Sequence, residues 1–279
     1  MSTLQADIIS IAEHNLATDQ SKTRHELFSV IKRHMPNSRA LASTSNIQFP
    51  TRYKPGGCLQ IVSSSIQGRI SQQGSDRYGR WTYVGLATRS QSMIFIITVY
   101  KPCKSSHQTG SLTVYKQQWT MMREEQVDYP EPRKQFDDDL LDFLQQLQHH
   151  SHRLIIVGDF NETRTHSKLF QNLYSMGLRD MVQSRHTNIP KFRSCNKGLN
   201  VIDYALCSLS ILPYIQISTY EPFMLNTISD HRGIVIDFDT KQMMGKPEKI
   251  ISPDSRGINS TNPVQVEKFI ERLQQLWKK

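Results

Sequence analysis

The stretch HRLIIVGDFN, residues 152–161, carries a strongly apolar centre into a glycine and a polar tip. An apolar run of this length that ends in Gly, Asp and Asn predicts a strand. The stretches NVIDYALCS at 200–208 and HRGIVIDF at 231–238 repeat the pattern. Each of the three brings an acidic residue to a strand end.

The rest of the chain mixes strands with helices. Continuous apolar character predicts a short strand at 6–13 that is covered on both faces and ends at Glu13. Further strands are expected at 56–63, 80–88 and 92–100, and the last two flank the polar turn RSQS as an antiparallel hairpin. Helical spacing predicts helices from about residue 21 to Pro36, over 111–125 and over 132–147. This mixture favours a mixed sheet in an α/β layered fold over a purely parallel, doubly wound one.

The length of 279 residues fits one domain with a tail. After Thr240 the chain is polar and rich in Pro, Gly, Ser and Asn, so we expect the domain to cover 1–239 and a linker to cover 240–262. Asn262 can cap a final helix, Pro263 suits its first position, and an apolar stripe predicts an amphipathic helix over 263–279 that needs a partner.

The formal net charge of +9 and the pI near 9.4 favour a polyanionic partner, either nucleic acid or an anionic membrane surface. A solvated basic surface is the alternative. The four cysteines form no CxxC pair, which favours structural thiols in a reducing compartment over a zinc site or a disulfide framework. There is no signal-peptide pattern and no apolar run long enough to span a bilayer, so we expect an intracellular protein, nuclear or cytoplasmic.

The tetrapeptide GDFN can carry phosphate chemistry. Side chains two apart in a strand share a face, so Asp159 and Asn161 point at one spot. The carboxylate can orient or deprotonate a water, and the amide can donate a hydrogen bond without adding negative charge. Taken alone, the motif is equally typical of a strand-ending turn.

Asp230 and His231 precede an apolar strand, and Asp203 holds the same kind of position in NVIDYAL. Histidine is easily poised for proton transfer near neutral pH, and Asp203 can accept a hydrogen bond from its imidazole. Asp230 is then free to bind a metal. Glu13 is a plausible ligand for Mg²⁺, although it reads equally well as an exposed strand end.

Several further residues are candidates for contact with a phosphate group. Tyr100 closes the strand at 92–100, where its phenol can touch a phosphate oxygen or simply pack. Basic residues in DRYGRW, TVYKPCK and NIPKFRS, among them Arg80, Lys101 and Arg193, are expected to neutralise backbone phosphates.

The ordered set AEHN, TVYKP, GDFN, VIDYAL and SDH resembles the endonuclease/exonuclease/phosphatase superfamily over residues 6–239. Within it, the sequence looks most like the endonucleases attached to reverse transcriptases in non-LTR retroelements. The resemblance implies a four-layered α/β sandwich of the DNase I type. It also implies a Mg²⁺-dependent enzyme, with Mn²⁺ as an alternative ion, that nicks DNA. DNA or RNA is the expected partner, beside a downstream reverse transcriptase module.

The resemblance also implies the site roles. Glu13 is a metal ligand with Asp230 on the metal-facing side, and His231 pairs with Asp203. Asp159 orients or activates the attacking water, Asn161 holds a phosphate oxygen, and Tyr100 contributes from its strand end.

The family also includes phosphoinositide phosphatases, sphingomyelinases and RNA deadenylases, which are the enzymatic alternatives. It begins with a strand bearing an Asn well ahead of the metal-binding Glu, whereas only a dozen residues precede Glu13. That departure predicts an N-terminally truncated domain. A catalytically impaired nucleic-acid-binding relic is therefore the non-enzymatic alternative.

Overall fold

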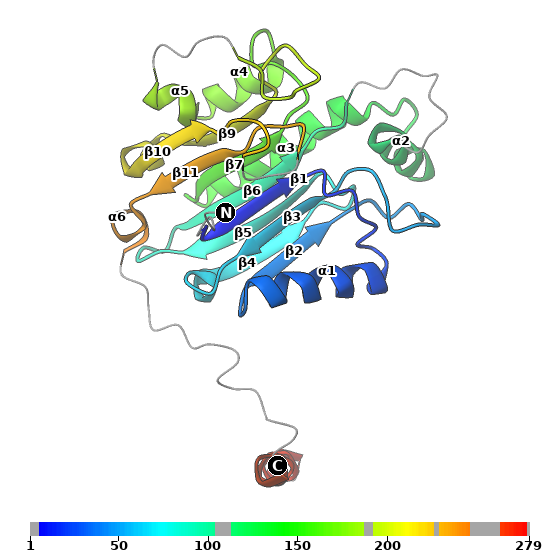
Figure 1. Ribbon diagram of the computed structural model, residues 1–279, viewed down its shortest axis with the longest axis vertical. Helices are drawn as coiled ribbons and strands as arrows, with labels where there is room; N and C mark the ends of the chain where they lie inside the picture. Colours follow the sequence, from blue (N-terminus) through cyan, green and yellow to red (C-terminus); the bar gives the residue numbers. More distant parts are fainter. Residues whose placement is uncertain (1–5, 104–112, 187–191, 226–228, 246–262, 278–279) are drawn as a thin grey trace. The chain divides into compact units, whose positions relative to one another are not determined.

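The computed structural model describes residues 6–103, 113–186, 192–225, 229–245 and 263–277. The chain divides into two units, Met1–Pro247 and Glu248–Lys279. The elements, drawn in Figure 1, are β1 (Ile8–Ala12), α1 (Ser21–His34), β2 (Arg39–Ser43), β3 (Cys58–Val62), η1 (Gln67–Arg69), β4 (Ile70–Ser75), β5 (Trp81–Ala87), β6 (Met93–Tyr100), α2 (Val114–Glu124), α3 (Pro132–His149), β7 (Arg153–Asp159), α4 (Lys168–Ser175), β8 (Leu178–Asp180), α5 (Met181–Arg185), β9 (Asp203–Ser208), η2 (Leu209–Tyr214), β10 (Ile215–Tyr220), β11 (Ile234–Phe238), α6 (Thr240–Met244) and α7 (Pro263–Trp277).

The largest sheet has the strand order β4-β5-β6-β7-β9-β8. Its strands pair antiparallel except for β6 and β7, which are parallel, so the mixed sheet and the β5–β6 hairpin expected from the sequence are confirmed. Side chains alternate between its two faces. Phe95, Ile97 and Val99 pack with α3 and α4 on one face, and Ile94 and Ile96 belong to the core on the other.

Two smaller sheets, β1-β3-β2 and β10-β11, cover the second face of the large sheet. Helix α1 packs its apolar residues on the outer side of β1-β3-β2 through a separate cluster that includes Ile31, Leu59 and Ile61. The order is therefore helices, large sheet, small sheets, helix (Figure 1). The four-layered α/β sandwich is confirmed.

The structure differs from the sequence prediction in three places. Strand β1 is only half-buried, with Ile11 37 % exposed, because β3 is its only strand partner among the described residues. Residues 240–244, predicted as linker, form α6, whose Met243 and Met244 are buried in the core of the domain. Strands β2, β4, β8 and β10 were not predicted because they are short or polar, and helices α4 and α5, of 8 and 5 residues, were not predicted because they are short.

The C-terminal helix α7 begins at Pro263 as predicted, while Asn262 and the rest of the predicted linker after residue 245 lie outside the described residues. Among the helices that the structure describes, none combines the length and the apolar character that crossing a bilayer requires.

Candidate active site

Three neighbouring strands bring polar side chains level with one another at one end of the large sheet. Tyr100 of β6 is the register partner of Asp159 of β7, and Asp159 is the register partner of Asp203 of β9. Partners on adjacent strands point to the same face of a sheet. The strand ends therefore place a phenol and two carboxylates side by side.

The conformation around Asp159 depends on its neighbours in GDFN. Gly158 has a φ of +147°, and a Cβ at this position would lie 2.0 Å from the backbone oxygen of Val99. Only glycine allows β6 and β7 to approach this closely beside Asp159. The left-handed φ of 47° at Asn161 then turns the chain back toward the carboxylate.

Asn161 holds Asp159 in place. Its backbone N–H donates to Asp159 Oδ1 at 2.8 Å, and its Nδ2 donates to Asp159 Oδ2 at 3.1 Å and to the Lys101 carbonyl at 2.8 Å. Burial raises the pKa of Asp159 to about 7, with a further rise from the charge of Asp203, while the Asn161 N–H and His231 act in the opposite direction. Asp159 is thus a carboxylate with a pKa suited to a general base near neutral pH.

His231 is held against Asp203. Its Nδ1 lies 3.0 and 2.9 Å from the two carboxylate oxygens, and its backbone N–H donates to Ser229 Oγ at 3.0 Å. The hydrogen bond to Asp203 raises the pKa of His231 to about 9, although burial opposes the rise. The imidazole is therefore cationic at neutral pH and fixed in orientation.

Glu13 and Asp230 add two more carboxylates to this group. Glu13 follows β1 with a left-handed φ of 58°; although its side chain is open to solvent, desolvation by the surrounding protein raises its pKa, and a hydrogen bond from Tyr100 opposes the rise. Asp230 is also exposed, and its Oδ2 lies 2.7 Å from Nζ of Lys197, which lowers its pKa.

The chemistry of this donor set fits a divalent cation. Glu13 and Asp230 interact electrostatically with each other, and carboxylate oxygens of Asp159 and Asp203 lie within 4.8 Å of one another beside them. Carboxylate oxygens are the ligands that Mg²⁺ and Mn²⁺ prefer. A cation would offset the desolvation and mutual repulsion that raise the pKa values of Glu13 and Asp159.

The sequence model of the endonuclease/exonuclease/phosphatase family matches residues 1–231. The chain belongs to this family. The curated proteins contain no match to the sequence.

Solved structures agree with the fold of the family. The 3' phosphatase NExo from Neisseria, bound to a product DNA hairpin, aligns with a TM-score of 0.54 at 16% identity over 84% of this chain and 89% of that chain. The catalytic domain of APE2 from Xenopus laevis gives 0.58 at 15% identity over 84% of each chain. The AP endonuclease LMAP from Leishmania major gives 0.58 at 14% identity over 84% of this chain and 78% of that chain.

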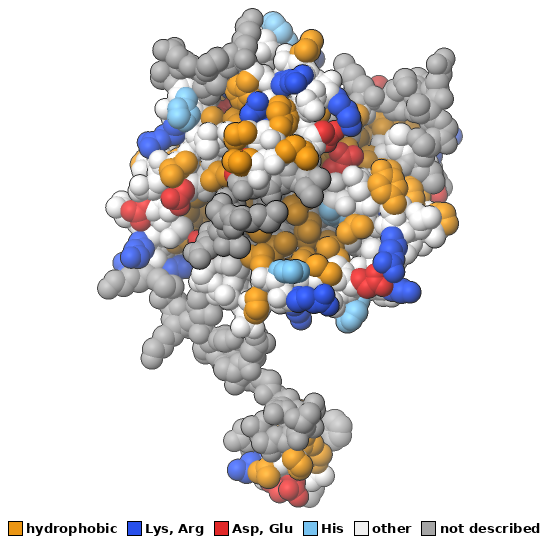
Figure 2. Space-filling model, viewed as in Figure 1, with side chains coloured by type: hydrophobic (Ala, Val, Ile, Leu, Met, Phe, Trp, Pro, Cys, Tyr) orange, Lys and Arg blue, Asp and Glu red, His pale blue; other side chains and the backbone are white. Residues whose placement is uncertain are grey.

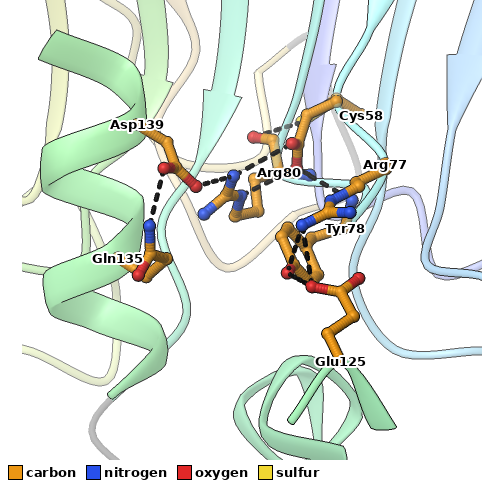
Figure 3. A network of polar contacts seen from close by, with 8 residues as sticks. Cys58, Arg77, Tyr78, Arg80, Glu125, Gln135 and Asp139 are labelled. Atoms are coloured by element: carbon orange, nitrogen blue, oxygen red, sulfur yellow. Dashed lines mark hydrogen bonds and ion pairs between the residues drawn. The ribbon is translucent and has the colours of Figure 1, made fainter. Parts of the chain in front are cut away.

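Two of the three basic residues expected at the substrate are buried. Arg80 is 1 % exposed and pairs with Asp76 at 2.7 Å and Asp139 at 2.6 Å, as Figure 3 shows for Asp139. Lys101, also 1 % exposed, pairs with Asp137 and Glu162. Their charges are neutralised inside the domain, so the expectation that they contact backbone phosphates is corrected.

Arg193 is exposed, as substrate contact requires, and donates to Asn196 at 3.0 Å. Its segment runs beside the site, because Cys195 forms an antiparallel bridge with His231. Two neighbours of the site were missed: Lys197 in this segment, and Cys103, whose Sγ lies 3.0 Å from Asn161 Oδ1. The basic stretch NIPKFRS was singled out, and extending it by three residues to NIPKFRSCNK would have included Lys197. Nothing in the sequence sets Cys103 apart.

Proposed function

We propose that this chain is a divalent-metal-dependent phosphodiesterase that hydrolyses the backbone of nucleic acid. The observation that carries the proposal is that Asp159, whose pKa is about 7, lies beside the cationic His231, which Asp203 holds in place. A base near neutrality and a fixed cation are the two groups that attack on a phosphate diester requires.

In the proposed reaction Asp159 accepts a proton from the attacking water. His231 donates a hydrogen bond to the phosphate oxygens as negative charge develops, and Asp203 keeps the imidazole cationic and oriented. The water oxygen bonds to phosphorus as the opposite P–O bond to the sugar breaks, and the sugar oxygen leaves and takes a proton from solvent, so no covalent intermediate on the protein is required. A Mg²⁺ or Mn²⁺ ion held by Glu13 and Asp230 would neutralise charge on the scissile phosphate.

Asn161 and Tyr100 have supporting roles in this proposal. The amide of Asn161 orients Asp159, and a phosphate oxygen would replace the longer of its two acceptor contacts, the one at 3.1 Å. Tyr100 hydrogen-bonds Glu13 and keeps that carboxylate directed into the site.

Nucleic acid is the substrate that the charge supports best. The chain carries a net charge of +9, and the exposed side chains of Arg193 and Lys197 lie on the segment beside His231. Among the structural neighbours, NExo is bound to a DNA hairpin. We further propose, on the motif resemblance, that the enzyme nicks DNA and is of retroelement type. Polymerase motifs in the flanking genomic sequence would support that subtype, and their absence would count against it.

The substrate class is tested by three parallel assays on the full chain with Mg²⁺, using supercoiled plasmid, single-stranded RNA and phosphoinositide vesicles. We expect nicked plasmid, no release of phosphate from lipid, and loss of nicking in Asp159→Asn and His231→Ala. The exposed residues Asp142 and His25 provide matched controls, Asp142→Asn and His25→Ala, which should keep full activity. Turnover of lipid but not of nucleic acid would overturn the substrate assignment.

A nucleic-acid-binding domain without turnover is the second candidate. It is supported by β1 and β11, each of which has one strand partner and one edge without a partner among the described residues. DNA binding that persists in the absence of any Mg²⁺-dependent cleavage would favour it.

A further inference from the structure

A groove of about 1100 Å³ lies between β1 and β11. Its floor is formed by β6 and β7 of the large sheet, and its inner end reaches Asp159 and His231. In Figure 1, β6 and β7 are visible behind the gap between β11 and β1, and Figure 2 shows hydrophobic side chains gathered in a hollow at the centre of this face.

The floor of the groove is an apolar part of the large sheet that the two smaller sheets cover only partly. On the face toward α3, Ile97 of β6 and Ile156 of β7 are completely buried. On the groove face of the same two central strands, Ile96 and Val157 remain partly exposed. The hydroxyl of Thr98 on this face is buried and has no hydrogen-bond partner in the described structure.

Both walls of the groove are strand edges that have no further strand partner in the part of the chain that the structure describes. Hydrogen bonds from Ser63 to the Asp7 carbonyl and from Glu13 to the Gly57 carbonyl show that the odd-numbered residues of β1 pair with β3. Because pairing alternates along an antiparallel strand, the backbone groups of Ile8, Ser10 and Ala12 point away from β3 toward the groove.

The same alternation applies to β11. The carbonyl of Gly233 and the N–H of Asp239 pair with Glu221 and Tyr214 on the β10 side. The backbone groups of the even-numbered residues between them, Ile234, Ile236 and Phe238, therefore point away from β10, and all three line the groove.

Two facing edges over an apolar floor have the form of a receptor for a strand, not for a small molecule. We propose that the groove binds one extended apolar strand of a partner polypeptide, which joins β10-β11 and β1-β3-β2 into a single six-stranded sheet. The strand is parallel to one wall and antiparallel to the other, because Glu13 follows the end of β1 whereas His231 precedes the start of β11.

The groove also selects the sequence of its occupant. Apolar residues at alternate positions would cover Ile96 and Val157, and a Ser or Thr hydroxyl could reach Thr98. Carboxylates line both ends of the groove, Asp7 and Asp237 at one end and Glu13 and Asp230 at the other. Basic residues should therefore flank the apolar stretch of the partner.

The test uses the full chain and the peptide acetyl-KTVSITVSK-amide, with acetyl-KTVSPTVSK-amide as the matched control, because a central proline cannot complete a ladder. At saturation we expect the first peptide to raise Tm by about 5 °C or more. Hydrogen exchange should slow at the amides of Ile8, Ser10, Ala12, Ile234 and Ile236, while the odd-numbered amides, already paired, should change little. The variant Ser10→Pro, checked for folding by circular dichroism, should lose the response.

Three outcomes would overturn the proposal. The first is that neither Tm nor exchange changes at millimolar peptide. The second is that the proline peptide acts as well as the first, which would mean nonspecific apolar binding. The third is that the same amides become protected with rising protein concentration alone, which would make a second copy of this chain the occupant. Since none of these readouts involves cleavage, failure here is distinguishable from failure of the proposed function.

Discussion

The contact between His231 and Asp203 can be tested quantitatively by replacing Asp203 with Asn. The hydrogen bond to Asp203 raises the pKa of His231 from 6.5 to about 9. Asn keeps the shape but removes the charge, so the pKa of His231 should fall toward 6.5, because burial lowers it and the largest cause of its rise is gone, although the charge of Asp159 still raises it. At 1.36 kcal/mol per pKa unit, this difference corresponds to roughly 3 kcal/mol of interaction between the imidazolium and the carboxylate.

The sign of the pH dependence follows from the direction of the shift. A histidine whose pKa is raised by folding stabilises the folded state fully below its unfolded pKa of about 6.5, and this contribution disappears as the pH rises through about 9. In urea unfolding, the free energy of unfolding of the wild type should therefore fall between pH 6 and pH 10 by up to roughly 3 kcal/mol more than that of Asp203→Asn. The exposed variant Asp142→Asn should follow the wild type.

The direct assay is an NMR titration of the histidine Cε1 protons in metal-free protein, with His231→Ala supplying the assignment. The wild-type signal should titrate near pH 9 and that of Asp203→Asn near pH 6.5. A wild-type midpoint close to 6.5, or the same midpoint in both proteins, would refute the reasoning.

Four other perturbations give separate expectations. Burial raises the pKa of Asp159 to about 7, so the wild type loses stability as the pH rises from about 4 through 7; Asp159→Asn should raise Tm at pH 8 while lowering cleavage by at least about 100-fold. Mg²⁺ should raise Tm of the wild type, and Glu13→Gln with Asp230→Asn should remove that rise, which differential scanning fluorimetry will detect. Arg193→Ala and Lys197→Ala should each lower the salt slope of DNA binding by about 1, whereas Arg80→Ala should lower stability because it leaves Asp76 and Asp139 unpaired. Gly158→Ala should cost at least about 3 kcal/mol in denaturant unfolding, while Gly198→Ala, where a Cβ meets nothing closer than 3.8 Å, should cost little.

The layered fold was predictable because its signals are local. The apolar runs of β5, β6, β7 and β9 and the short turn between β5 and β6 are visible in the sequence, and they define the centre of the large mixed sheet. The apolar run of β3, in the smaller sheet, is equally visible. Strands β4 and β10 were missed because ISQQGS and IQISTY alternate with polar residues and contact the core through few side chains.

The candidate site was predictable in membership but not in all roles. Asp159 and Asp203 stand at strand ends, His231 lies just before β11, and the fold brings the three together in space. The burial of Arg80 was not predictable, because one of its two partners, Asp139, lies 59 positions away on α3. A sequence shows a positive charge but not the carboxylate that neutralises it.

The position of the open groove leaves no local signal in the sequence, for a similar reason. The stretch at 6–13 reads as a strand covered on both faces, and its residues do have the required apolar character. Whether both edges of that strand are paired depends on β11, more than 200 positions along the chain. Sheet edges are a property of the assembled topology and leave no local signal.

The central claim, that these residues hydrolyse phosphodiester bonds, is tested most directly by single-turnover cleavage of a labelled DNA duplex. The wild type, Asp159→Asn, His231→Ala and the double variant should be compared with and without Mg²⁺ from identical preparations. We expect cleavage only with Mg²⁺ and a loss of rate of at least about 100-fold in each single variant. The total loss in the double variant should be much smaller than the product of the two single losses. Wild-type cleavage that is unaffected by chelation, or that persists in the double variant, would contradict the account.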